Sequence, residues 1–130
     1  MSRHDPRAFL HDIMVACARI REFTSGIDLE VYRQNVMVRS AVERQFEIIG
    51  EALNGLSQAD PELARRITDV SRIIAFRNRL IHGYATVSDE VVWGVIGVSL
   101  PLLEEEVAGL LQELEEMGEP QAQSNDGAEH

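Results

Sequence analysis

The chain has 130 residues, which is enough for one domain with a hydrophobic core. It carries 12 basic residues, all of them arginine, and 22 acidic residues, so its net charge of −10 argues against broad, non-specific nucleic-acid binding. A single cysteine excludes an internal disulfide and a cysteine-cluster zinc site. Because there is no apolar run of about 18 residues and no hydrophobic signal stretch at the N-terminus, we expect a cytoplasmic protein with no membrane partner.

The charge is distributed unevenly along the sequence. Residues 88–130 contain 11 acidic residues and no basic ones, whereas all 12 arginines lie within residues 1–87. Five of these arginines fall between positions 65 and 79, where the only acid is Asp69. Arginine is well suited to phosphate contacts, although a general preference for arginine over lysine explains the composition equally well. A local arginine-lined cleft is therefore compatible with the overall acidity.

Capping residues and apolar spacing predict the first helices. Asp5 followed by Pro6 is typical of a helix start, and the first helix should end before Gly26. Asp28 can begin a short helical turn. Apolar residues recur at steps of three and four along the first helix: Phe9, Leu10, Ile13, Cys17, Ile20 and Phe23.

The middle of the chain predicts two more long helices. One should cover about residues 35–56, and a short helix should begin at Asp60 and the proline after it. Thr68 can cap a third long helix that reaches His82 and ends at Gly83, a favourable residue for a helix C-terminus.

The last third predicts one long helix and a tail. Ser88 can cap this helix, Pro101 should kink it, and Trp93 lies off its main apolar stripe, so it could fill a second contact. Residues 118–130 are almost without apolar side chains, which is typical of a disordered, acidic tail. The sequence therefore predicts an all-α, antiparallel four-helix bundle with an extra short helix over residues 1–117.

The segment 77–84 interrupts the apolar pattern of the third helix. Spacing requires an apolar residue at position 77, and the chain places Arg77 there. A charge on a core-directed stripe is costly unless it is paired or faces a cleft, so this exception indicates a candidate site. Asn78 and His82 share one helix face, and His82 lies about 140° around the helix from Arg77. A helix C-terminus favours the protonated form of His82, which suits a general acid or a phosphate partner.

Structural explanations for the same residues remain open. Arg77 could pair with Glu47 or Glu51 on the preceding long helix, and His82 could simply cap its own helix. The tyrosine at position 84, beside a glycine, could be an edge-of-core aromatic or an exposed, modifiable side chain. The other histidines have no partners at metal-ligand spacing, so we expect no metal.

The segment Arg77-Asn78-Arg79-Leu80-Ile81-His82-Gly83-Tyr84 resembles the Arg-x4-His-x-Tyr motif of HepT-like proteins in the HEPN superfamily. Residues 41–52 resemble the second-helix signature of that family, and residues 91–103 resemble its last helix. The resemblance spans about residues 8–115. It departs from the family pattern at residues 69–70, 85 and 88, while the three motif residues are intact.

This resemblance implies a homodimer in which two copies of the motif face each other across a cleft. It implies a metal-independent endoribonuclease that acts as the toxin of a type VII toxin–antitoxin pair and needs no cofactor. The cognate antitoxin would be an MntA-like nucleotidyltransferase that silences the toxin by transferring AMP to the motif tyrosine, Tyr84.

The resemblance also implies roles for individual residues. His82 would act as general acid or base, and Arg77 would stabilise charge on the phosphoryl oxygens of the RNA substrate. Asn78 would orient the phosphate or His82, and Arg79 would contact the RNA backbone. Two alternatives remain open: a non-catalytic HEPN subunit that binds nucleotide or substrate for a nucleotidyltransferase, and a purely structural helical dimer.

Overall fold

The computed structural model describes residues 5–82 and 87–128, with side chains as far as residue 117, and it is all-helical within these ranges. The long helices are α1 (Pro6–Thr24), α3 (Val36–Ala59), α5 (Val70–His82) and α7 (Leu100–Ala128). The short elements are α2 (Leu29–Gln34), α4 (Pro61–Ala64), α6 (Asp89–Gly94) and the π-helical turn η2 (Val95–Ser99). The predicted all-α class is confirmed, while the four-helix bundle and the homodimer stay predictions.

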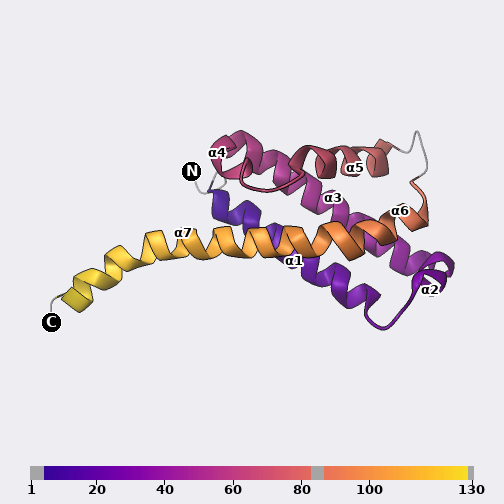
Figure 1. The fold of residues 1–130 in the computed structure, drawn as a ribbon, viewed down its shortest axis with the longest axis horizontal. Coiled ribbons are helices and arrows are strands. Elements are labelled where there is room, and N and C mark those ends of the chain that lie inside the picture. The colour runs from indigo at the N-terminus through magenta and orange to yellow at the C-terminus, as the bar shows by residue number, and fades with distance from the viewer. Residues whose placement is uncertain (1–4, 83–86, 129–130) are drawn as a thin grey trace.

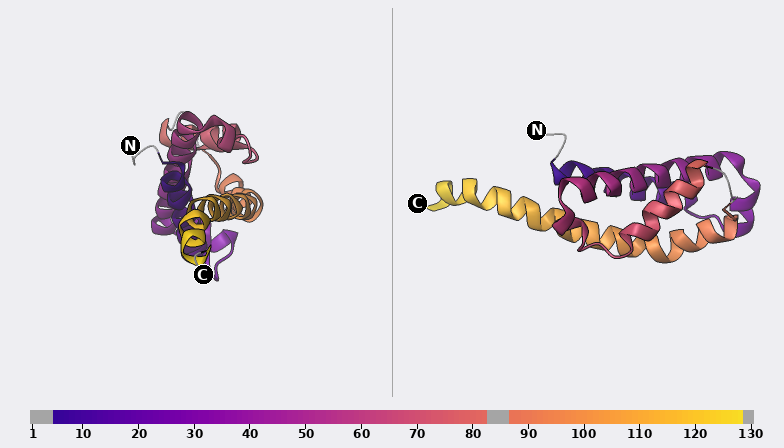
Figure 2. Two further views of the ribbon diagram at one scale, coloured as in Figure 1. Left: turned by 90° about the vertical axis from the view of Figure 1, so that its left-hand side faces the viewer. Right: turned by 90° about the horizontal axis from the view of Figure 1, so that it is seen from above.

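The helices pack in a chain of neighbours. α1 packs on α3 and on α7, and α5 packs on α3 (Figure 1). Figure 2 shows the same arrangement from the end and from above, with the C-terminal part of α7 projecting past the other helices. The motif helix α5 therefore has one main packing partner, and part of its surface remains open.

The core is formed mainly by side chains of α1, α3 and α7, with Tyr32 of α2 and Val92 of α6. Each fully buried leucine or isoleucine side chain contributes about 1.5–3 kcal/mol to the free energy of unfolding, relative to an exposed one. The largest fully buried side chains are Tyr32, Leu10, Ile13, Ile20, Ile49, Leu53, Leu56, Val42, Val92, Val107 and Cys17. α5 has no buried residue of its own, and its apolar side chains are only partly covered.

Side-chain caps begin most of the helices where the sequence predicts. Asp5 Oδ1 accepts a hydrogen bond from the amide of Arg7 at the start of α1. Asn35 Oδ1 accepts from Val38 at the start of α3, and the Ser88 hydroxyl accepts from the amide of Val91 at the start of α6. These caps satisfy amides that have no partner within the helix.

Thr68 does not cap α5, so that prediction is wrong. Its amide and its hydroxyl both donate to the carboxylate of Glu106 on α7, at 2.9 and 2.7 Å. The chain turns at Asp69, whose φ of 63° is in the left-handed region, before α5 begins at Val70. This turn separates Thr68 from the helix, and the tertiary contact takes its place.

The predicted last helix is interrupted before Pro101. Proline has no amide hydrogen and cannot bond to the carbonyl four residues earlier. In the preceding turn, the amide of Leu100 bonds to the carbonyl of Val95, five residues back, which makes η2 a π-helical turn. Trp93, just before this turn, packs against Tyr32 of α2 with ring centroids 5.2 Å apart.

The structure and the composition differ at the C-terminus. α7 continues as a helix to Ala128, where the sequence predicts a disordered tail from residue 118. Figure 1 shows that this end extends away from the other helices. Helices without tertiary packing are marginal in water, so the disorder of residues 118–130 in solution stays a prediction. Within the described ranges, every helix is too short or too polar to cross a membrane.

Candidate functional site

The described motif residues all lie on α5, and they differ in exposure. Arg77 and Asn78 are half-buried, whereas Arg79 and His82 are exposed. α5 stays helical through His82, so Arg77 and His82 remain about 140° apart around its axis. Within one chain they occupy different sides of the helix, and a phosphate that contacts both must lie against the surface between them.

Gly50 of α3 provides the space for Arg77. A Cβ atom added at Gly50 would lie 2.3 Å from Cβ and 2.5 Å from Cγ of Arg77. The aliphatic part of the arginine therefore crosses directly over the backbone of α3. The missing side chain at position 50 explains how a charged residue fits on the core-directed side of α5.

The head group of Arg77 is held by its neighbour in sequence. Nη1 donates to Asn78 Oδ1 at 2.8 Å, and Nε is buried without a hydrogen-bond partner among the described residues. The predicted alternative, an ion pair with Glu47 or Glu51, is not formed in this structure. The Glu47 carboxylate pairs with Arg44 at 3.2 Å. A guanidinium without a carboxylate partner retains its donors for an anionic ligand.

The roles expected of Asn78 and of the motif tyrosine both stay predictions. Asn78, expected to orient a phosphate or His82, is in contact with Arg77. Tyr84 lies outside the described residues, so its place relative to His82 is not part of the structure.

A groove runs between α5 and η2. It has a volume of about 520 Å³, and an apolar wall borders two arginines. The side chains that line it are those of Asp69, Arg72, Ile73, Ala75, Phe76, Arg79, Val95, Val98 and Ser99. Arg79 is three residues from His82, so the groove begins next to the histidine on the helix surface.

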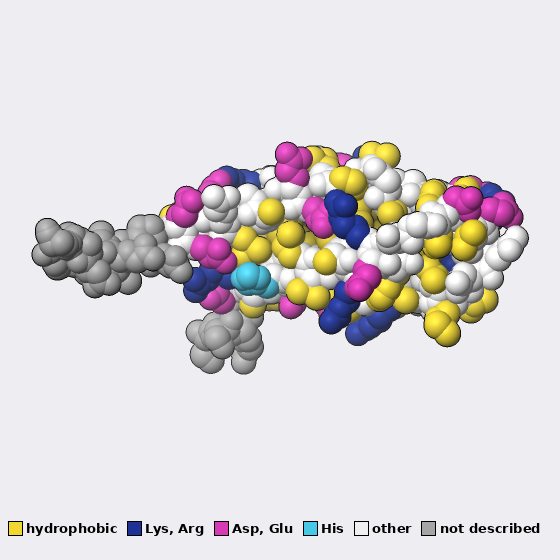
Figure 3. Space-filling model, turned by 90° about the horizontal axis from the view of Figure 1, so that it is seen from below, with side chains coloured by type: hydrophobic (Ala, Val, Ile, Leu, Met, Phe, Trp, Pro, Cys, Tyr) yellow, Lys and Arg dark blue, Asp and Glu magenta, His cyan; other side chains and the backbone are white. Residues whose placement is uncertain are grey.

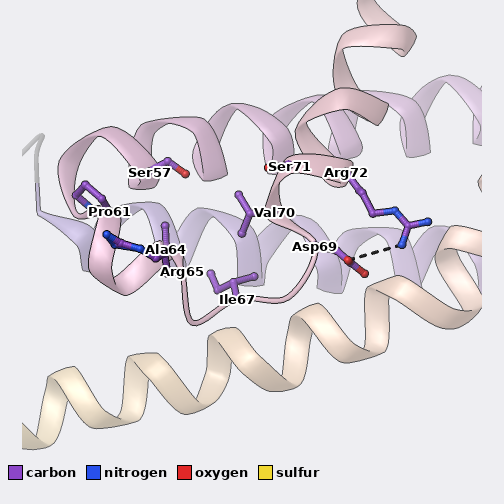
Figure 4. Close-up of a pocket in the computed structure, with 9 residues that line it drawn as sticks. All are labelled: Ser57, Pro61, Ala64, Arg65, Ile67, Asp69, Val70, Ser71 and Arg72. Carbon is purple, nitrogen blue, oxygen red and sulfur yellow. Dashed lines mark ion pairs between the residues drawn. The ribbon is translucent and has the colours of Figure 1, made fainter.

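A second hollow lies at the other end of α5 (Figure 4). It has a volume of about 460 Å³ and is bordered by the end of α3, by α4 and by the first turn of α5. Arg72, which also lines the groove, has one long contact of 3.7 Å with Asp69, and Arg65 pairs with Glu62 at 3.4 Å. Arg72 and His82 are ten residues apart, about 15 Å along the helix, so this hollow is separate from the motif.

Two features of the site go beyond the residues that the sequence predicted. The close contact of Gly50 with Arg77 has a signal in the sequence, because a glycine within a strongly helical, apolar segment often marks a close approach of backbones. The groove has no such signal, since its two walls come from α5 and from a π-helical turn.

The comparison with protein families shows which family the chain belongs to. Residues 13–110, which include Gly50, Arg77 and His82, match the model of a family described as "HepT-like: Ribonuclease HepT-like". The chain belongs to the HepT-like family. The resemblance seen in the motif therefore extends over most of the helical domain.

HepT-like relatives are similar along nearly their whole length. "Putative RNase MJ1380" of Methanocaldococcus jannaschii is 33% identical over 109 residues, which are 82% of this chain and 97% of the relative. "Putative RNase TTE0752" of Caldanaerobacter subterraneus subsp. tengcongensis is 32% identical over 82% of this chain and 95% of its own length. "Probable ribonuclease HepT" of Thermococcus cleftensis is 34% identical over 73% of this chain and 86% of its own.

No solved structure matches the chain. Among the residues that the structure describes, no group of three histidine, cysteine, aspartate or glutamate side chains could hold a metal ion.

Proposed function

We propose that this HepT-like protein is a metal-independent endoribonuclease and the toxin of a type VII toxin–antitoxin pair. Relatives of similar length are named as ribonucleases. The observation that carries the proposal is the state of Arg77, a motif arginine held next to Asn78 without a carboxylate partner among the described residues. A structural arginine would be expected to pair with a nearby acid, whereas a phosphate-binding one needs its donors free.

In the proposed reaction, the 2′-hydroxyl of one nucleotide attacks the adjacent phosphorus. The bond from phosphorus to the 5′-oxygen breaks, which leaves a 2′,3′-cyclic phosphate and a 5′-hydroxyl. His82 either takes the proton from the 2′-hydroxyl or donates one to the departing 5′-oxygen. Arg77 stabilises the charge that develops on the phosphoryl oxygens. A homodimer supplies two copies of His82, one for each proton transfer.

Regulation of the proposed toxin follows from the family resemblance. An MntA-like nucleotidyltransferase would transfer AMP to Tyr84, two residues after His82. The added phosphate and nucleoside would bring bulk and negative charge next to the motif, and both would repel RNA.

The proposal predicts separable effects of His82→Ala and Arg77→Ala. Each variant should lose cleavage of total RNA by about 100-fold or more, because general acid–base catalysis and electrostatic stabilisation each contribute at least that much. Arg77→Lys keeps the charge and much of the packing, and should recover part of the activity. Cleavage is followed on denaturing gels, with circular dichroism as the test of folding.

Parental rates in both alanine variants would disprove the roles given to Arg77 and His82. RNA binding without cleavage by the parental protein would favour the alternative of a non-catalytic binding subunit. A loss of several kcal/mol of stability in Arg77→Ala would favour the structural alternative.

A further inference from the structure

The charge on α5 is distinctive within this acidic protein. The helix contains three arginines and His82 and no acidic residue. The described arginines elsewhere form ion pairs, with the exception of Arg19 on α1. Figure 3 shows basic and acidic side chains interspersed over the underside of the molecule. On α5, by contrast, Arg77 and Arg79 have no carboxylate within ion-pair distance among the described residues, and Arg72 has a single long contact of 3.7 Å to Asp69.

The groove beside Arg79 combines this charge with an exposed apolar wall. Val98 is 76% exposed. Phe76 and Val95 are half-buried, and the Phe76 ring packs edge-to-face on Phe46 of α3, with ring centroids 5.2 Å apart. The volume of about 520 Å³ lies within the range of about 300–1,000 Å³ typical of pockets that bind small ligands. The groove can therefore take a flat apolar group, with anionic groups beside it.

The arginines are spaced along the rim of the groove. Arg79 is close to His82, whereas Arg72 lies two helical turns before Arg79, about 10 Å along the helix. One extended strand could therefore contact both arginines through different phosphates while it passes His82. A two-fold contact between copies of this chain would instead bring the arginines of both copies together, and the one acid that lines the groove, Asp69, contacts only Arg72 among the described arginines.

We propose that the groove between α5 and η2 binds the nucleotide next to the scissile linkage, with its unstacked base against Phe76, Val95 and Val98 and with phosphates on Arg79 and Arg72. This inference rests on the proposed ribonuclease function and adds a binding subsite to it. Because the base must leave its stack to enter the groove, the bound strand must be unpaired there.

The test uses a fluorescein-labelled, mixed-sequence RNA of 12 nucleotides with 2′-fluoro substitution, which removes the attacking hydroxyl. Binding is measured by fluorescence anisotropy at several salt concentrations. Arg79→Gln should weaken binding and reduce the slope of log Kd against log salt concentration by about 0.7, the value for one phosphate contact with a single strand. Val98→Glu should weaken binding roughly tenfold, because it replaces an apolar contact of about that worth with a carboxylate that repels phosphate.

Arg19→Gln is the matched control, because Arg19 is also exposed and lacks a carboxylate partner among the described residues but lies on α1. It should bind like the parental protein, and a duplex of the same sequence should bind more weakly than the single strand. Parental affinity in Arg79→Gln and Val98→Glu would overturn the proposal. So would a loss of affinity in Arg19→Gln as large as in the groove variants, or binding of the duplex as tight as that of the single strand. So would a lower sedimentation mass of RNA-free Val98→Glu, because the groove would then hold a second copy.

Cleavage of unmodified RNA by the parental protein is measured in parallel. If the protein cuts RNA and the groove variants bind normally, the ribonuclease proposal stands and the subsite is wrong. If the protein cuts nothing while Arg79→Gln and Val98→Glu lose binding, the groove stands as an RNA site and the catalytic proposal fails.

Discussion

Arg77 occupies a position that its sequence environment would give to an apolar residue. The stem of the side chain lies on Gly50, and the guanidinium is held by Asn78. A long arginine can bury its methylene groups while its charged end stays accessible. The cost of a cation on the inner side of α5 is thereby limited, and the charge remains available for a ligand.

Gly50→Ala should therefore damage the site although alanine favours helices. The new methyl group would lie 2.3 Å from Cβ of Arg77, so α5 or the arginine must shift. We expect a loss of about 1–3 kcal/mol in the free energy of unfolding, as for other overpacked positions, together with reduced RNA cleavage. Stability is measured by urea denaturation and activity with a labelled RNA.

Gly109→Ala on α7 is the matched control. A Cβ atom there meets nothing within 4 Å, so the variant should gain about 0.5–1 kcal/mol from helix propensity alone. If Gly50→Ala were as stable and as active as Gly109→Ala, the close contact with Arg77 would have no role.

The helices α5 and α7 are connected mainly through the segment that precedes α5. The Glu106 carboxylate accepts two hydrogen bonds from Thr68, and Arg66 pairs with Glu113 at 2.8 Å. These contacts fix the start of α5 against α7. The far end of α5, with His82, leads directly into the segment that carries Tyr84. The contacts with α7 therefore fix the segment before α5, and at the other end of the helix His82 is exposed.

Glu106→Ala should lower the free energy of unfolding by about 1 kcal/mol or slightly more, since it removes the acceptor of two partly solvated hydrogen bonds. Glu105→Ala, the exposed neighbour on the same helix, should change stability by less than about 0.5 kcal/mol. Urea denaturation of both variants and of Thr68→Val provides the comparison. Equal stability of the two glutamate variants would show that the contact with Thr68 contributes nothing.

The whole chain divides into a packed helical domain and a C-terminal extension of α7. The last well-buried side chains on α7 are Leu110 and Leu111, and Leu114 is packed against the core. Beyond residue 117, α7 leads away from the other helices (Figure 1). The structural boundary of the domain therefore agrees with the end of the apolar pattern.

A chain that ends at residue 117 should keep the free energy of unfolding of the full chain within about 0.5 kcal/mol, as for changes outside the core. A chain that ends at residue 109 also loses Leu110, Leu111 and Leu114, and should lose at least about 3 kcal/mol or fail to fold. Thermal unfolding followed by circular dichroism distinguishes these cases. A strongly destabilised 117-residue chain would show that the extension packs on the domain.

Local features of the sequence were sufficient for most of the helix starts, the all-α class and the placement of Arg77, Asn78, Arg79 and His82 on one helix. Caps act within three residues, and apolar spacing repeats within one turn, so both can be read from neighbouring positions. The family match over residues 13–110 then confirmed the resemblance to HepT-like proteins.

Contacts between distant segments could not be predicted from neighbouring positions in the sequence. The bond of Thr68 to Glu106, the packing of Trp93 on Tyr32 and the missing carboxylate partner of Arg77 all depend on how helices meet in space. The apolar periodicity predicts which side of a helix faces the core. It does not predict which residues of another helix that side contacts. The groove beside Arg79 exists for the same reason, because its shape is set by the distance between α5 and η2.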